Sequence, residues 1–348
     1  MKKIYTIPLG IILAFLIGAI LLAFQGFSPL ISYVSMFKNS LLTPIAAGNT
    51  LVRMAILLVI GLSAYFGFNS GVNNLGLFGQ LLSGALVATL IGQNLKIFPQ
   101  FLLLFMLISA AIAGGLIAGI AALLWKWFNM NEFITTLMMN FIVDFFVAYL
   151  ITYPMRDAGS QWPMSAPIER AGVFPKIGFI DLSVIVAFLI YALIFIHWTY
   201  TRQGYEYRMA GINNQFAQLG GCRTEKNYIS AMMISGALAG IAGAFLIMGS
   251  TQQNKLIPSL GKSNSNDGLM IAIISGNSLL SVLIFSLFFG MIQTGAVGMQ
   301  MDTNVPNEFT MMLQAVMVLF VVAFRDYADV FISKLNARDE ARKLEAKK

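Results

Sequence analysis

Three polar side chains share one face of a segment that is otherwise apolar. Thr136, Asn140 and Asp144 are spaced four residues apart, so on a helix they form one stripe. Asn140 falls near the centre of the apolar segment 132–152, where a polar group is costly unless it faces protein or a water-filled cavity. An amide side chain both donates and accepts hydrogen bonds. The stripe therefore either binds a polar solute or hydrogen-bonds a neighbouring helix.

Further amides lie where apolar runs are interrupted. Asn69 and Gln80 belong to FNSGVNNLGLFGQLLSGALVA (68–88), a break rich in glycine and amides, and Asn277 ends a short apolar segment. Such breaks expose backbone groups that need partners in water, in protein or along a pathway. The pattern predicts either a polar pathway or simple turns and bonds between helices.

Residues with catalytic or metal-binding chemistry are scarce. The chain has one histidine, His197, beside Trp198 and Tyr200 in a pattern typical of a membrane interface. One cysteine, Cys222, excludes an internal disulfide and a CxxC motif. The phosphate-binding motif GxxxxGK[ST] is absent. We therefore interpret the protein as a non-enzyme with no metal or other cofactor in this chain.

The elements that position these groups are expected to be transmembrane helices. Of the 348 residues, 58% are hydrophobic and 11% are charged, against roughly 25% charged residues in soluble domains. This composition predicts an all-α, polytopic bundle of about ten transmembrane segments, forming a single domain over 1–348 with a charged tail at 325–348. The segment at 268–277 is about half a crossing and is expected to be a half-helix. Apolar windows place the segments near 5–25, 50–68, 75–93, 100–125, 132–152, 179–200, 228–249, 268–277, 279–298 and 308–325.

Lysine and arginine predict how the segments are oriented. With both termini in the cytoplasm, the cytoplasmic connections are 69–74, 126–131, 201–227 and 278, and these together with the terminal segments carry fourteen of the 22 cations. This excess agrees with the positive-inside rule. The proline-rich loop from Tyr153 to Gly178 is then external.

Small residues repeat at helical spacing in two segments. The fourth segment has Gly115 and Gly119, and the seventh has Ser235, Gly236, Ala239, Gly240 and Gly243. Small residues let helix backbones approach closely in lipid, so we expect these faces to build the bundle.

The long connection before the seventh segment carries the most specific pattern. Between two apolar segments, residues 213–219 can form about two helical turns, too short and too polar to enter lipid. On physical grounds alone this is an ordinary loop or a surface knob for a peripheral protein. The loop resembles the coupling loop of ABC importer permeases of the branched-chain amino acid, ribose and nucleoside type. The residues that carry this resemblance are Gly204, Arg208, Ala210, Gly211, Asn213, Ala217 and Gly220. The following SGALAGIAGAF (235–245) is similar to that family's next helix.

This resemblance implies partners. In the family, the loop contacts a cytoplasmic ATPase, so residues 211–221, and within them Gly211, Asn213, Ala217 and Gly220, are implied as the coupling element. ATP is then bound by the partner ATPase. The resemblance also implies two further protein partners: an extracytoplasmic binding lipoprotein and a second permease chain that forms a heterodimer with this one. It implies a multi-pass protein of a bacterial cell membrane and no nucleic-acid partner.

Two further stretches resemble the nucleoside branch of that family. These are Phe68, Asn69 and Gly71 followed by Gly79 and Gln80, and the run NEFITTLMMNFIVDFF (131–146). The resemblance implies a nucleoside substrate, and the amide of Asn140 suits a nucleobase edge or a ribose hydroxyl. The implied pathway residues are Asn69, Gln80, Thr136, Asn140, Asp144 and Asn277.

Other substrates and mechanisms stay open. Ribose, another sugar or a branched-chain amino acid are the near alternatives within the family. An ion-coupled secondary transporter would need intramembrane acids, and Asp144 is the only acid well inside a segment. Uptake that survives loss of the ATPase but collapses with an uncoupler would indicate that class.

Overall fold

A computed structural model describes residues 3–95, 98–250, 254–306, 308–309, 311–316, 318–320 and 322–323, with side chains from residue 12 onward. The predicted tail, 325–348, lies outside the described residues. Two compact units are present: a terminal unit of Met1–Thr43 with Ile292–Lys348, and a central unit of Pro44–Met291. This division reflects packing, and a single functional domain over 1–348 stays a prediction.

The central unit is built from helices joined by short connections. A two-stranded antiparallel hairpin precedes α7, with Lys176 opposite Asp181. The elements are α3 (Pro44–Asn69), α4 (Leu77–Asn94), α5 (Pro99–Phe128), α6 (Glu132–Thr152), η1 (Arg170–Gly172), β1 (Lys176–Ile177), β2 (Ile180–Asp181), α7 (Leu182–Tyr200), α8 (Arg202–Ile212), α9 (Asn214–Leu219), α10 (Thr224–Met248), α11 (Lys262–Ser275) and the first half of α12 (Leu279–Thr303).

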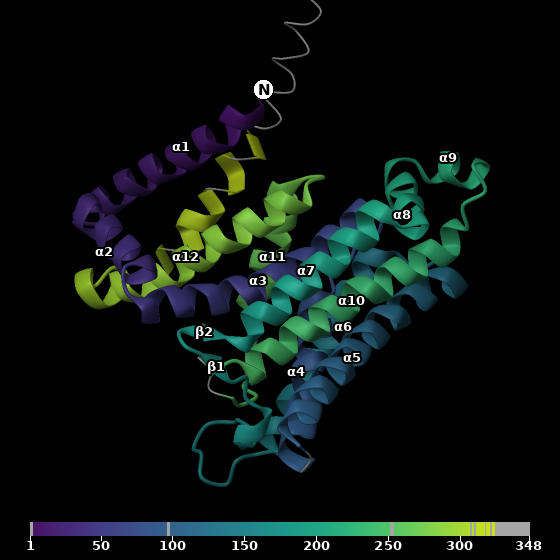
Figure 1. The fold of residues 1–348 in the computed structure, drawn as a ribbon, viewed down its shortest axis with the longest axis horizontal. Helices are drawn as coiled ribbons and strands as arrows, with labels where there is room; N and C mark the ends of the chain where they lie inside the picture. The colour runs from purple at the N-terminus through teal and green to yellow at the C-terminus, as the bar shows by residue number, and fades with distance from the viewer. Residues whose placement is uncertain are drawn as a thin grey trace, which may run out of the picture. The chain divides into compact units, whose positions relative to one another are not determined.

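Helix α10 is the centre of this packing, in contact with α3, α4 and α5 (Figure 1). Its small residues allow that position. A Cβ atom at Gly240 would overlap the carbonyl oxygen of Ala110 on α5, and one at Gly243 would overlap that of Leu81 on α4. The predicted small-residue faces are therefore confirmed as the surfaces where these helix backbones meet.

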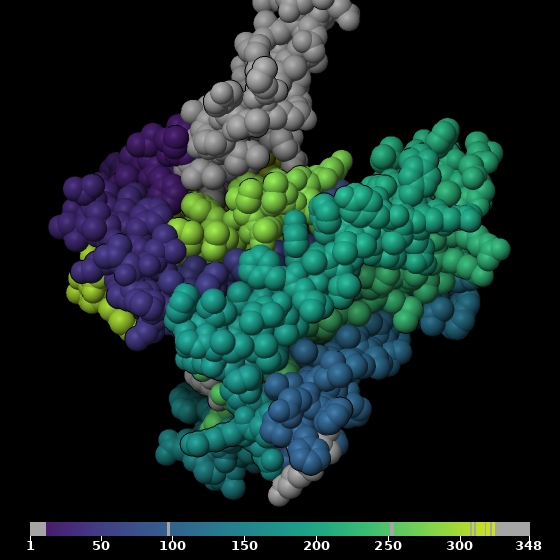
Figure 2. Space-filling model, viewed as in Figure 1, coloured from purple at the N-terminus to yellow at the C-terminus, as the bar shows by residue number. Residues whose placement is uncertain are grey.

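Outer and inner helices differ in which side chains they expose. Every residue of α3 from Met54 to Gly67 is buried, whereas α7 exposes large apolar side chains that include Leu189 and Leu193. The side chains of α7 cover this face of the central unit and continue to α8 and α9 (Figure 2). A helix face that exposes many large apolar side chains is typical of helices that contact lipid.

The helices confirm a polytopic helical membrane protein. Six of those in the described residues are long and apolar enough to cross a membrane: α3, α5, α6, α7, α10 and α12. The remaining predicted segments correspond to α1 (Lys3–Phe24), α4, α11 and the apolar run Met311–Phe320. Ten crossings and cytoplasmic termini stay predictions.

Helix α11 has the length expected of a half-helix. Its 14 residues span about 21 Å at 1.5 Å per residue, less than the ~30 Å of a bilayer's apolar core. Gly261 (φ 77°) precedes it and Gly276 (φ 56°) follows it, and both positive φ angles favour glycine. These glycines set both ends of the helix.

The connections of the central unit gather at two ends. The segments after α3, α5 and α11 meet α8 to α10 at one end, where Asn69 Nδ2 donates to the carbonyl oxygen of Gly276 (3.2 Å). The β1–β2 hairpin lies at the other end (Figure 1), with the 153–178 loop, whose Ser165 N–H donates to the carbonyl oxygen of Leu256 (3.0 Å). The connections predicted to be cytoplasmic thus share one end.

The terminal unit contains α1, α2 (Pro29–Leu41) and the second half of α12. Leu22, Met36, Met299, Val305, Phe309 and Leu313 form its buried core. Asp302 accepts hydrogen bonds from Ser35 Oγ (2.5 Å) and Asn39 Nδ2 (2.8 Å), which fix α2 against α12.

Candidate functional site

The break between α3 and α4 is organised around Asn74. Its Oδ1 accepts from Gln80 Nε2 (2.8 Å) and from the Gly76 N–H (3.0 Å), and its Nδ2 donates to Gln80 Oε1 (2.8 Å) and to Ser235 Oγ (2.9 Å). Asn74 and Gln80 are each 1% exposed. All hydrogen-bonding positions of the Asn74 amide are therefore filled inside the protein.

Two serines extend this polar cluster into the contact between α3 and α10. Ser63 Oγ donates to the carbonyl oxygen of Ser235 (2.6 Å), and Ser235 Oγ donates to that of Ser63 (2.8 Å). Both side chains are fully buried. The sequence indicated only a packing role for Ser235 and gave no sign of Asn74 or Ser63, because their grouping depends on α10, which is far from α3 in sequence.

The predicted stripe on α6 faces the start of α4. Asn140 Nδ2 donates to the carbonyl oxygen of Leu75 (2.9 Å), and its Oδ1 accepts from the Gly79 N–H (2.7 Å). A Cβ atom at Gly79 would lie 3.1 Å from the Asn140 Cα, so glycine permits this approach. Asn140 thus supplies partners to the backbone groups that the break exposes.

The other two members of the stripe also have protein partners. The Thr136 hydroxyl donates to the carbonyl oxygen of Glu132 in its own helix (2.7 Å), and its side chain packs against Gly76. Ser259 Oγ lies 3.1 Å from each carboxylate oxygen of Asp144. The stripe faces protein, while contact with a substrate stays a prediction.

The end of α3 is hydrogen-bonded to the backbone of Gly276 and Asn277. Asn69 Nδ2 donates to the carbonyl oxygens of Tyr65 (3.0 Å) and Gly276 (3.2 Å), and Tyr65 Oη donates to that of Asn277 (3.0 Å). The Asn277 side chain itself is exposed. The structure therefore joins the break after α3 to the turn between α11 and α12.

The predicted coupling loop folds as two helices, α8 and α9. Asn213 caps α9, its Oδ1 accepting from the Phe216 N–H (2.9 Å), and Ala217 is buried. Gly220 follows the helix and has room for a Cβ atom. The short helix expected at 213–219 is thus confirmed.

Gly211 packs directly on the break after α3. A Cβ atom at Gly211 would overlap the carbonyl oxygen of Asn69, and one at Gly71 would lie 3.1 Å from the Gly211 Cα. Gly71 also has a positive φ of 76°. The coupling loop and the amide-rich break, two separate patterns in the sequence, are therefore in backbone contact.

The tip of the loop exposes apolar side chains. Ile212 at the end of α8 and Phe216 and Leu219 on α9 are 78%, 61% and 89% exposed. Exposed apolar groups beside polar ones are typical of a protein-binding surface.

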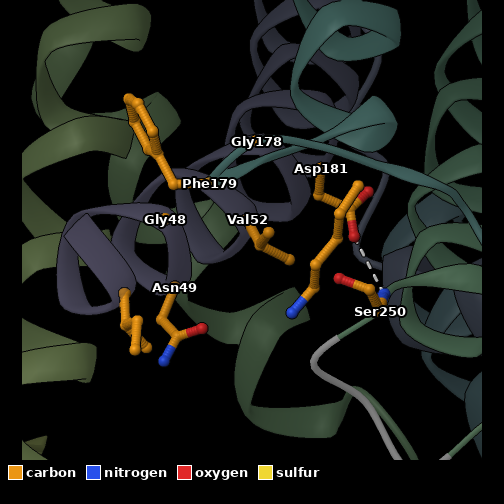
Figure 3. Close-up of a pocket in the computed structure, with 9 residues that line it drawn as sticks. Gly48, Asn49, Val52, Gly178, Phe179, Asp181 and Ser250 are labelled. Atoms are coloured by element: carbon orange, nitrogen blue, oxygen red, sulfur yellow. Dashed lines mark hydrogen bonds between the residues drawn. The ribbon is translucent and has the colours of Figure 1, made fainter.

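A small pocket with both polar and apolar lining residues lies at the opposite end of the central unit (Figure 3). It has a volume of about 200 Å³ between the start of α3, the hairpin and the end of α10. Asp181 accepts from the N–H groups of Ser183 (2.8 Å) and Ser250 (2.9 Å), joining α7 to the segment after α10. No motif in the sequence indicated this pocket.

A second carboxylate at that end lies in the 153–178 loop. The Gly159 N–H and then Lys255 Nζ hold the pKa of Asp157 below its usual value. Lys255 Nζ lies 3.2 Å from Asp157 Oδ2, and this ion pair connects the loop to the segment after α10.

Residues 46–322 match the family described as branched-chain amino acid transport system / permease component. Similar proteins include the guanosine ABC transporter permease protein NupP of Bacillus subtilis, 29% identical over 335 residues and 94% of each chain. The nucleoside ABC transporter permease protein NupB of Lactococcus lactis is 26% identical, covering 97% of this chain and 95% of its own. The glucose ABC transporter permease protein TsgB13 of Haloferax volcanii is 28% identical, covering 91% and 86%.

Proposed function

The chain belongs to the family of branched-chain amino acid transport system permease components, and from this premise we propose that it is the transmembrane subunit of an ATP-driven nucleoside importer. Membership of this family makes the chain a transport protein and not an enzyme. It is an integral membrane protein, and we place it in a bacterial cell membrane.

The contact between Gly211 and Asn69 carries the ATP-driven part of the proposal. A cytoplasmic ATPase that docks on the exposed apolar side chains of α9 is one backbone contact away from the break between α3 and α4. Movement of the loop would therefore be passed to the break between α3 and α4 by direct backbone contact. We assign Gly211, Asn213, Ala217 and Gly220 to this coupling element.

The substrate class rests on two relatives. The proteins named for guanosine and for nucleosides align with this chain over nearly its whole length. The relative named for glucose aligns to a similar extent, which keeps sugars as the second candidate. We propose that the substrate passes beside the break, near Asn69, Gln80, Thr136, Asn140, Asp144 and Asn277.

The proposed assembly has three further components. These are the ATPase, which binds ATP, a second permease chain that completes a heterodimer, and an extracytoplasmic lipoprotein that delivers the substrate. Affinity purification of the tagged chain from its own membrane, with mass spectrometry of its companions, tests this composition. Absence of any ATPase from the purified complex would contradict it.

Uptake measurements test the substrate. We expect saturable uptake of radiolabelled guanosine that requires this chain, is blocked by vanadate and is reduced by excess adenosine. Excess ribose, glucose or leucine should leave it unchanged. If ribose, glucose or leucine, and not adenosine, competes with guanosine for uptake, that compound replaces the nucleoside as the proposed substrate. Uptake that persists without the ATPase but stops with an uncoupler would indicate an ion-coupled transporter.

A further inference from the structure

An open cavity of about 480 Å³ lies beside α9, at the end of the central unit that holds the coupling loop. The carboxylate of Glu132, the amides of Asn129, Asn131 and Asn214, and the rings of Trp125 and Tyr228 line it. Asn214 belongs to α9, and Gly71, which also lines the cavity, contacts Gly211. A protein that docks on α9 would therefore cover this cavity.

Glu132 is held in place by neutral donors. Asn73 Nδ2 donates to Oε1 (2.6 Å), and Tyr228 Oη donates to Oε2. A carboxylate group has about four acceptor positions, so roughly two remain for another donor. Its orientation is fixed before any partner arrives, which lowers the entropic cost of binding.

The other acidic residues at this end already have cations. Glu206 pairs with Arg202 (3.1 Å), and Glu225 pairs with Lys126 (3.3 Å). Within the described part of the chain, no cationic group lies within 4.0 Å of Glu132. The cavity therefore carries one negative charge without an ionic partner.

The aromatic rings, like the unpaired carboxylate, favour a positively charged ligand. Trp125 and Tyr228 are stacked with ring centroids 3.9 Å apart. Aromatic ring faces attract cations, and the amide oxygens of Asn129 and Asn214 can accept hydrogen bonds from them, whereas that of Asn131 already accepts from the N–H groups that it caps at the start of α6. Carboxylate, amides and rings together suit a guanidinium or ammonium group and would repel an anion.

We propose that this cavity accepts a basic side chain, arginine or lysine, from the cytoplasmic ATPase. The inference rests on the proposed function, because that ATPase is the protein expected to cover α9. An arginine can bond both remaining acceptor positions of a carboxylate at once. The contact joins the ATPase to α6 directly, and through Asn73 and Tyr228 to the break and to α10, beside the route through Gly211.

The test compares two substitutions that remove one negative charge from the same end. Glu132→Gln removes the charge in the cavity, and Glu225→Gln removes a charge already paired with Lys126. The probe is the ATPase subunit identified by co-purification with the wild-type chain. Its dissociation constant is measured for detergent-solubilised complexes between 50 and 500 mM NaCl, a range over which salt screens ion pairs progressively.

We expect Glu132→Gln to weaken ATPase binding about tenfold at low salt, and to reduce its salt dependence, since charge-assisted hydrogen bonds are lost. Glu225→Gln should change binding less than about twofold, as is usual for an exposed ion pair. Equal affinity and equal salt dependence for wild type and Glu132→Gln would overturn the inference.

A third variant separates partner binding from internal bracing. Asn73→Ala removes a hydrogen bond to Glu132 but keeps its charge, so the salt dependence of ATPase binding should stay as in wild type. If Asn73→Ala weakens binding and flattens its salt dependence as much as Glu132→Gln, Glu132 only braces the break and the inference is wrong. Failure of the wild-type chain to retain any ATPase would overturn the proposed function, and this inference with it.

Discussion

Asn140 shows what a single residue's spacing can predict. Its position on the same face as Thr136 and Asp144 predicted a polar stripe directed at protein or a cavity, and the structure places Asn140 against the start of α4. The spacing could not identify its partners, because they are backbone groups of Leu75 and Gly79, which any residue type could supply. The residue type therefore predicts how many hydrogen bonds an amide side chain can make, but only the folded structure shows which groups it bonds.

We expect Asn140→Leu to reduce both stability and uptake. Leucine leaves the Leu75 carbonyl and the Gly79 N–H without partners, and each unsatisfied buried group costs about 1–3 kcal/mol. The thermal unfolding temperature of the detergent-solubilised protein should therefore fall by several degrees. An unchanged unfolding temperature would contradict the bracing role.

The same variant tests contact with the substrate. If Asn140 also hydrogen-bonds the nucleoside, the half-saturation constant of an assembled Asn140→Leu transporter should rise roughly 5- to 150-fold. Asn140→Gln is the comparison, since it keeps the amide. A wild-type half-saturation constant in a correctly assembled Asn140→Leu complex would limit Asn140 to bracing α4.

Asn74 and Gln80 should behave as one unit. Replacing either residue with leucine leaves the other's amide buried and partly unpaired, which is more costly than losing both partners together. We expect each single variant to lower the thermal unfolding temperature, and the double variant Asn74→Leu/Gln80→Leu to lower it by less than the sum. Strictly additive effects would show that the two amides act independently.

At the scale of elements, sequence patterns located helices better than contacts between them. The apolar windows coincide with α3 to α7 and α10, because a chain in lipid must satisfy its backbone bonds within each helix. The short helix at α9 was also predicted. Its exposed apolar side chains, and the contact of Gly211 with Asn69, were not, since both depend on how α8 is placed against α3.

Two glycines of the coupling loop should differ sharply in tolerance. Even alanine at Gly211 would overlap the Asn69 carbonyl oxygen, whereas a Cβ atom at Gly220 meets its nearest atom at an ordinary 3.4 Å. We expect Gly211→Ala to insert into the membrane normally but to lose uptake and stimulation of the ATPase. Gly220→Ala should keep both. Full uptake and ATPase stimulation in Gly211→Ala, or in the bulkier Gly211→Trp, would exclude this loop as the coupling element.

At the scale of the whole molecule, hydropathy identified a membrane protein but not its internal arrangement. Helix α4 is 18 residues long and almost wholly buried, with Gln80, Ser83 and Thr89 among its inward side chains. These polar side chains explain why α4 is not among the six helices that are long and apolar enough to cross a membrane, since α3 and α10 are also largely buried and do qualify. The grouping of Asn74 with Ser235 likewise required the packed fold.

The two ends of the central unit should lie on opposite sides of the membrane. The structure gathers the connections around α9 at one end and the 153–178 loop at the other, and the cations of both termini predict that the α9 end is cytoplasmic.

Single cysteines can test this topology in a Cys222→Ala background, because Cys222 is the chain's only cysteine. We expect a membrane-impermeant maleimide, applied to intact cells, to label Ser160→Cys but not Gln218→Cys or Ala346→Cys. After the membrane is opened, all three should react, which shows that each position is accessible. Labelling of Ser160→Cys and Gln218→Cys from the same side would contradict the topology, and labelling of Ala346→Cys from outside would place the C-terminus on the other face.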